Sequence, residues 1–314
     1  MSRKLEIDAL SADLAALDAL LSRSSPNDVV GRMGLESRRR EIERLLLELR
    51  GQGEEKQAAV ALYFGGLPVI GSRGIKAEFA SEALSSYQDL ITKIWATSET
   101  GVLRAMGPIK DKDASQLHIT GIAHGSFGFL LEELDEMGSP LFTTPLKQAT
   151  SQATELIMAF ASEREDQFEQ ALEVVSQRVF SSLRDFLKSI HREEAVFRMV
   201  EGDSDVIFDH AAVERAYQRA ETYSIDEEII ETQGELLGVI PIGRRFEFKV
   251  TNGDVVSGKV GVLFSQTYLE RVEREQLVGK VWKARINRKQ KRAFGKTTES
   301  YTLLELMEIV KPSA

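Results

Sequence analysis

Leucines recur at spacings of three and four near the start of the chain, which predicts an amphipathic helix over residues 4–22. After a Ser-Ser-Pro-Asn break, Leu35, Ile42 and Leu49 recur at intervals of seven, with arginine and glutamate at most positions between them. This pattern predicts a coiled-coil-like helical hairpin over residues 1–56. Its two narrow apolar stripes can be covered by each other, by the following domain or by a second copy, so we expect self-association through the hairpin.

The hydrophobic pattern changes after a short glycine-containing linker and predicts an α+β middle domain over residues 57–223. A wholly apolar run at residues 58–64 is typical of a buried strand, and helical spacing follows near residues 75–96. Alternating apolar and polar positions around residues 117–131 and 196–208 predict two β-hairpins. The middle domain should therefore contain both a sheet and helices.

Two longer helices are expected to support this middle domain. Thr144 before Pro145 is typical of an N-cap and a first helical position, which predicts a helix over residues 145–161. Apolar residues at spacings of three and four continue over residues 163–192, which we interpret as a single helix about 40 Å long at 1.5 Å per residue. Because the connection between them is very short, the two helices should pack antiparallel.

The last part of the chain, residues 224–314, is predicted to form a small β-barrel. Asn252-Gly253 between two alternating runs is a strong hairpin signal, because both residues tolerate positive φ angles. We expect a capped helix from Ser265 to about Gln276 and two further strands after it. Three strands, a helix and two strands give the connectivity of an OB-like barrel, with an SH3-like barrel as the alternative. The predicted fold class is α+β.

Composition restricts the kind of protein that this fold can be. The chain has 314 residues, of which 42% are hydrophobic, and no cysteine. It can therefore build a core without disulfides, and it lacks the ligands of zinc ribbons and iron–sulfur clusters. No apolar run approaches the roughly 20 residues of a spanning helix, so we expect no membrane contact and a cytoplasmic location. The net charge of −9 disfavours attraction of the whole molecule to nucleic acid, but screening leaves room for a local basic patch.

Such a basic patch is the strongest functional signal in the sequence. Without any acidic residue among them, the cations are Lys280, Lys283, Arg285, Arg288, Lys289, Lys291, Arg292 and Lys296. In an OB-like barrel this run includes the connection between the fourth and fifth strands, which such barrels use to hold oligonucleotides. We therefore expect nucleic acid or an acidic protein partner to bind there, and Trp282 to lie in the core instead. The alternative is a solvated run that balances the chain's own acids.

A glycine-rich segment before the predicted helix near 75–96 resembles a phosphate-binding loop only in spacing. Gly66 and Gly71 have the separation of a P-loop, but Ser72 and Arg73 stand where lysine and serine or threonine are required. We interpret the segment as a structural turn. The alternative is an anion site formed by the backbone amides of Gly71, Ser72, Arg73 and Gly74.

Two histidines, His118 and His124, are the candidates for acid–base chemistry. On a regular strand, residues six apart lie on one face but about 20 Å from each other, so they cannot share a metal ion. The sequence has no metal-binding spacing, and we expect no metal and no cofactor. No nucleophile motif identifies catalytic residues.

Our preferred hypothesis is a non-catalytic binding and assembly protein that contacts nucleic acid through the basic run. One alternative is an enzyme that combines the anion-binding glycine turn, residues 65–74, with a histidine acid or base. Another is an accessory subunit of a larger complex. The sequence alone leaves these alternatives open.

Overall fold

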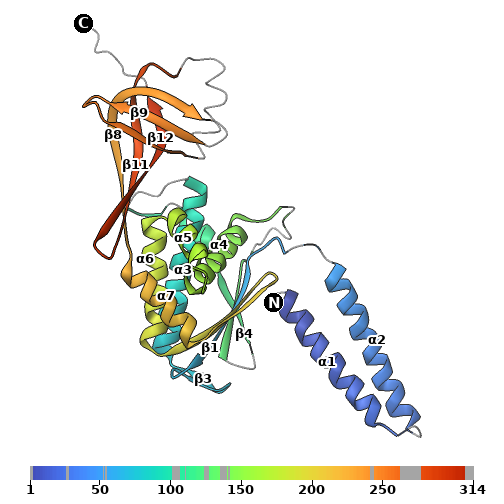
Figure 1. Cartoon of the computed structure of the whole chain (residues 1–314). Helices are drawn as coiled ribbons and strands as arrows, with labels where there is room; N and C mark the ends of the chain where they lie inside the picture. The colour runs from blue at the N-terminus through green and yellow to red at the C-terminus, as the bar shows by residue number, and fades with distance from the viewer. Residues whose placement is uncertain are drawn as a thin grey trace.

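The computed structural model has three parts in chain order: two projecting helices, a middle domain and a barrel at the opposite end (Figure 1). The described residues are 3–25, 28–51, 53, 55–100, 107–109, 111–123, 127–134, 140, 142–240, 244–261 and 277–307. The expected helix from Ser265 to Gln276 and the residue His124 lie outside them. None of the described helices has the length and apolar character needed to cross a membrane.

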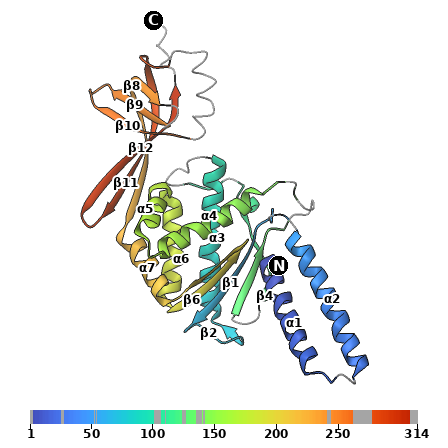
Figure 2. The same cartoon turned by 45° about the vertical axis from the view of Figure 1, so that its right-hand side comes forward.

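Two helices at the start of the chain lie side by side and point away from the rest of the molecule (Figures 1 and 2). They are α1 (Arg3–Arg23) and α2 (Val29–Gly51). An ion pair of 2.8 Å joins Arg39 on α2 to Asp18 on α1. In α2 only Ile42 and Leu46 are buried, and in α1 no residue is. Each helix therefore covers only part of the other's apolar stripe.

The middle domain is built on a five-stranded antiparallel sheet in the order β4-β5-β1-β6-β7. Its strands are β1 (Ala59–Gly66), β4 (His118–Ala123), β5 (Phe127–Glu132), β6 (Ala195–Glu201) and β7 (Ser204–Phe208). The central strand β1 is buried on both faces from Val60 to Phe64. This double burial explains its continuous apolar sequence, which does not alternate.

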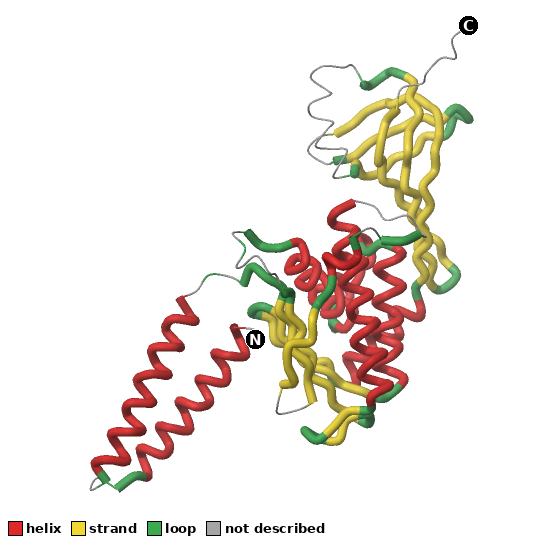
Figure 3. Tube along the Cα trace, turned by 180° about the vertical axis from the view of Figure 1, so that it is seen from behind, coloured by secondary structure: helices red, strands yellow, loops and turns green. Residues whose placement is uncertain are grey.

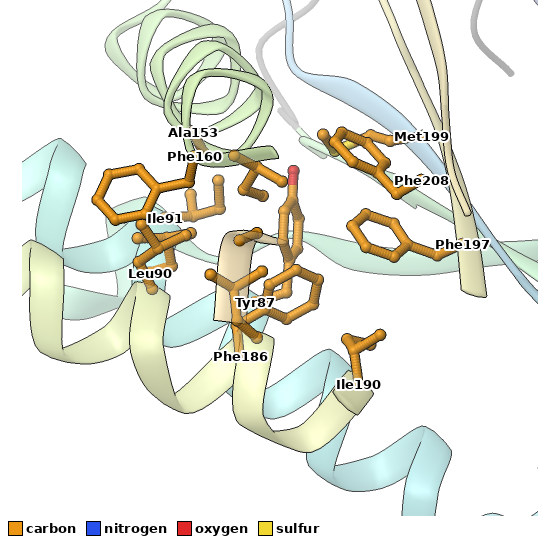
Figure 4. Close-up of a cluster of buried hydrophobic side chains, with 14 of the residues drawn as sticks. Tyr87, Leu90, Ile91, Ala153, Phe160, Phe186, Ile190, Phe197, Met199 and Phe208 are labelled. Carbon is orange, nitrogen blue, oxygen red and sulfur yellow. The ribbon is translucent and has the colours of Figure 1, made fainter. Parts of the chain in front are cut away.

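Helices pack on one face of this sheet (Figure 3). They are α3 (Ala77–Thr100), α4 (Pro145–Ala161), α5 (Glu165–Val174), α6 (Gln177–Arg192) and α7 (His210–Thr222), with a short 3-10 helix at Lys112–Ser115. Aromatic side chains pack between the helices and the sheet (Figure 4). The ring centroid of Tyr87 on α3 lies 5.8 Å from that of Phe186 on α6, which lies 5.6 Å from that of Phe197 on β6. On the other face, Leu5 of α1 packs against Ala61 of β1 and its neighbours.

A buried ion pair joins two of the described elements of this domain. Lys147, in the first turn of α4, pairs with Glu201 at the end of β6, and both side chains are buried. The hydroxyl of Ser151 donates a second hydrogen bond, of 2.9 Å, to the same carboxylate. Buried charges are tolerated when they are paired and hydrogen-bonded in this way, so the pair holds the start of α4 against β6.

The single helix predicted over residues 163–192 is wrong, because the structure has two helices, α5 and α6. Val175 is extended, with φ −64° and ψ 132°, and Ser176 is the N-cap of α6, whose hydroxyl accepts a hydrogen bond from Val179 N. Serine competes well for this position, since its side chain satisfies an amide that a new helix leaves free. The expected antiparallel pairing also differs, because α6 packs mainly against α3 and α7.

The C-terminal part is a closed five-stranded β-barrel in the order β10-β12-β11-β8-β9. Its strands are β8 (Ser224–Ile240), β9 (Arg245–Val250), β10 (Val255–Val260), β11 (Val281–Ala293) and β12 (Lys296–Met307). The barrel has its own core, in which Trp282 is buried and donates a 2.8 Å hydrogen bond to the carbonyl of Leu277. A Cβ atom at Gly258 would lie 2.0 Å from the Tyr301 carbonyl oxygen, so β10 can approach β12 only with glycine there.

Candidate functional site

The basic run predicted to bind an anion lies on the paired strands β11 and β12. Four of the seven residues expected to make the contact pair with carboxylates of the barrel itself. The pairs are Lys283–Glu231 (2.6 Å), Arg285–Glu305 (3.0 Å), Arg288–Glu228 (2.7 Å) and Arg292–Asp226 (3.2 Å). The register explains them, because the acids of β8 lie opposite or diagonal to three of these cations of β11, and Glu305 of β12 lies opposite Arg285. Intramolecular partners therefore balance most of this charge.

Lys289 has a different role, because its side chain is only 7% exposed. Its ammonium donates hydrogen bonds to the carbonyl oxygens of Leu172 (3.2 Å), Glu173 (2.9 Å) and Val175 (2.5 Å). These carbonyls belong to the end of α5 and the residue after it, where a helix leaves acceptors free and its dipole favours a cation. Lys289 thus fastens the barrel to the middle domain. Of the seven residues expected to contact a partner, Lys289 is therefore buried in a contact within the chain.

A second contact joins the barrel to the same helix break. The backbone amide of Gln177 donates to the Glu227 carboxylate (3.1 Å), and the amide of Glu227 donates to the Gln177 side-chain oxygen (3.0 Å). Gln177 is the first residue of α6, so its free amide gains an acceptor. The break at Ser176, which sequence reasoning missed, is therefore the place where β8 and β11 attach.

The docked lysine makes stability depend on pH. Burial lowers the pKa of Lys289 from 10.5 to about 8, with Glu227 opposing the shift. Between these values the unfolded chain binds more protons than the folded one, so this group's contribution to the free energy of unfolding rises with pH, by up to about 1.4 kcal/mol per unit. Well below pH 8 both states are protonated and the contribution no longer changes with pH. We expect urea unfolding from pH 7.5 to 10 to show this rise in the free energy of unfolding in the wild type and not in Lys289→Met. Parallel dependences on pH in the two proteins would contradict this expectation.

Two cations of the predicted set remain. Lys291 and Lys296 have no ion pair within the described residues. They flank the turn between β11 and β12, where Phe294 is exposed and lies 6.3 Å from the Tyr223 ring. This turn is at the end of a long ribbon that extends from the barrel toward α7 (Figures 1 and 2). Two separate lysines form a much smaller site than the sequence suggested.

A second set of cations, which sequence reasoning missed, lies on the outer face of β9 and β10. Phe246 and Phe248 point into the core, so Arg245 before them and Lys249 after them point outward. On β10 the exposed Lys259 lies directly opposite Arg245 in the strand register. Like charges placed opposite each other destabilise a sheet, and a bound anion would remove that cost.

Arg244 is exposed beside this pair, Glu247 lies on the same outer face, and Glu235 of β8 lies directly opposite Lys249 in the strand register. The part of the chain that the structure describes provides no ion pair for Arg244, Arg245, Lys249 or Lys259. We call these four residues the β9–β10 cation face. A sequence signal for it existed: these cations alternate with apolar residues on both sides of the Asn-Gly hairpin.

The glycine segment forms a small hairpin of β2 (Val69–Ile70) and β3 (Gly74–Ile75). Gly71 has φ +53°, and the amide of Arg73 donates to the Ile70 carbonyl (3.0 Å). Because β3 separates this turn from the start of α3 at Ala77, the amides of Gly71, Ser72, Arg73 and Gly74 do not lie at a helix N-terminus. The local geometry is that of a structural turn.

His118 begins the edge strand β4, opposite Glu132. The other candidate acid or base, His124, lies outside the described residues. Within those residues, no group of three or more histidine, aspartate or glutamate side chains could hold a metal ion.

The surface of the middle domain also contains two cavities. One, of about 810 Å³, is lined mostly by apolar side chains of α4, α5 and β7. The other, of about 510 Å³, is lined by serines and by carboxylates such as Glu78 and Asp185 of α3 and α6. Neither is lined by His118 or by the turn from Gly71 to Gly74.

Comparisons with protein-family models and with curated proteins identified no similar protein. The functional argument therefore depends on the arrangement of charges and apolar surfaces in this chain alone.

Proposed function

We propose that this chain is a non-catalytic binding and assembly protein whose barrel binds single-stranded nucleic acid across β9 and β10. The observation that carries the proposal is the placement of Lys259 opposite Arg245, neither of which has an ion pair in the described chain. Lys249 lies on the same face, opposite Glu235 of β8 but without an ion pair to it. Phosphate groups supply the missing negative charge. The binding surface is thus the β9–β10 cation face, and the neutralised run on β11 has a structural role.

The strand order supports an OB-like barrel as part of this proposal. The first barrel strand, β8, pairs with β9 and with β11, and the third, β10, pairs in parallel with the fifth, β12. A simple meander would instead pair the third strand with the fourth. In OB-like barrels the face formed by the second and third strands holds oligonucleotides, and here those strands are β9 and β10.

Charge distribution supports the choice of a polyanion. Residues 224–314 contain 15 lysines and arginines and 13 acids, which is a net charge of +2. Since the whole chain has a net charge of −9, residues 1–223 carry a net charge of −11. Electrostatic attraction would therefore orient an approaching strand toward the barrel. Because Phe246 and Phe248 of β9 are in the core, base stacking contributes little on this face and affinity should depend strongly on salt.

Two matched triple variants test the proposal. Arg245→Ala/Lys249→Ala/Lys259→Ala removes three cations without an ion pair, whereas Arg285→Ala/Arg288→Ala/Arg292→Ala removes three that are paired. Each lost phosphate contact should reduce the slope of log affinity against log salt by about 0.7, so the first variant should lose about 2 units of slope and at least about tenfold in affinity.

The paired-cation variant should keep its affinity for an oligonucleotide of about 20 nucleotides, long enough for one barrel, to within about threefold. Fluorescence anisotropy at several salt concentrations measures both quantities, and duplex DNA of the same length serves as comparison. Equal losses in the two variants, or no binding by the wild type, would remove the β9–β10 cation face from consideration.

The assembly part of the proposal is supported by α1 and α2, which we interpret as the predicted helical hairpin. Within the chain, every residue of α1 is at least partly exposed. A projecting arm with so little burial gains stability when another protein covers it. An accessory subunit of a larger complex, the alternative from the sequence, would use the same arm.

A further inference from the structure

The far end of the α1–α2 hairpin carries an uncovered apolar patch. Leu20 lies in the last turn of α1, and Val29, Val30 and Met33 lie near the start of α2. All four are exposed, Val30 by 83% and Met33 by 64%. We call these four residues the hairpin tip. Adjacent large apolar side chains on a projecting surface mark an interaction site in soluble proteins.

The middle domain contains a matching recess, the cavity of about 810 Å³. It is bordered by Met158 of α4, Val174 of α5 and Ile207 of β7, and the last two are 78% and 72% exposed. We call this cavity the apolar groove. Its volume falls within the roughly 300–1,000 Å³ of pockets that enclose a compact apolar body.

We propose that the hairpin tip of one molecule inserts into the apolar groove of a second copy of the same chain. Each molecule has one tip and one groove on different elements, so the contact is head-to-tail and leaves a free tip and a free groove at the ends. The tip cannot fill the groove of its own molecule without detaching, because Lys4 of α1 donates to the carbonyl of Asp203 (3.3 Å) and the hairpin then points outward (Figure 1).

Charge complementarity favours this occupant. Arg23 is exposed at the hairpin tip, and Glu155 is exposed where it lines the apolar groove. Within the described residues, neither side chain has an ion pair. Insertion of the tip would bring this cation to that carboxylate at the rim of the contact, where such a pair fixes register and specificity. The inference concerns assembly and does not depend on nucleic-acid binding by the barrel.

Sedimentation velocity without nucleic acid tests the proposal. The wild type should self-associate with a Kd of about 10–100 µM, as expected for a small interface. Val30→Asp/Met33→Asp at the tip and Met158→Asp/Ile207→Asp at the groove should each weaken association by at least about 100-fold. Circular dichroism verifies that both variants keep the wild-type fold.

Mixing the two variants gives the decisive result. The tip variant keeps an intact groove and the groove variant keeps an intact tip, so an equimolar mixture should form a dimer that grows no further. The swap Arg23→Glu/Glu155→Arg should likewise restore the association that either single change weakens. A monomeric wild type at about 500 µM, far above the Kd range of small interfaces, would overturn the proposal. So would a groove variant that associates like the wild type, because the hairpins would then pair with each other.

Discussion

Replacing Lys289 by glutamate is expected to lower the free energy of unfolding by about 4 kcal/mol or more and to detach the barrel from α5. The substitution places a carboxylate against the carbonyl oxygens of Leu172, Glu173 and Val175, which now accept hydrogen bonds from the lysine. It also places negative charge at the C-terminal end of a helix dipole. Urea unfolding measures the loss of stability, and limited proteolysis near residue 175 measures the detachment.

The matched control is Lys291→Glu, the same substitution two residues along β11. Lys291 has no ion pair in the described chain, so its replacement should change the free energy of unfolding by less than about 1 kcal/mol. Equal effects of the two substitutions would mean that Lys289 contributes only general charge and that the barrel is not fastened through this contact.

Glu201→Ala is expected to cost about 3–5 kcal/mol, because it leaves the ammonium of Lys147 buried without its partner. The hydroxyl of Ser151 loses its acceptor as well. The effect should be visible as a lower midpoint of chemical unfolding and as weaker docking of α1, whose Arg3 pairs with Asp203 two residues further along.

Two comparisons separate burial from charge in this experiment. Glu41→Ala removes an exposed carboxylate that pairs with Arg38 at 2.8 Å, and it should cost no more than about 0.5 kcal/mol. Lys147→Met/Glu201→Leu removes both buried charges and should recover most of the loss, because no unpaired ion remains. A double variant as unstable as Glu201→Ala would contradict this interpretation.

Local signals in the sequence predicted much of the fold. Thr144 caps α4 as its position before Pro145 indicated, and its hydroxyl accepts a hydrogen bond from Lys147 N (3.1 Å). The Asn252-Gly253 turn joins β9 to β10. Such features depend on residues a few positions apart, so a pattern read along the chain contains them. The break between α5 and α6 was missed because apolar spacing continues through Val175 and Val179.

The candidate site was harder to predict because its electrostatics are non-local. Arg288 is neutralised by Glu228, which is 60 residues earlier, and the acceptors of Lys289 are more than 110 residues away. A basic run in the sequence indicates the cations but not the acids that the fold places beside them. Conversely, alternation with apolar residues indicates that Arg245 and Lys259 are on the surface, but only the register shows that they lie opposite each other.

Lysine acetylation with and without an oligonucleotide tests the central claim most directly, because mass spectrometry reports each lysine separately. We predict that bound single-stranded nucleic acid protects Lys249 and Lys259 from acetylation and leaves Lys283 and Lys296 as reactive as before. Lys289 should be unreactive both with and without the oligonucleotide. Protection of Lys283 and Lys296 with full reactivity at Lys249 and Lys259 would contradict the account and return the binding site to the basic run.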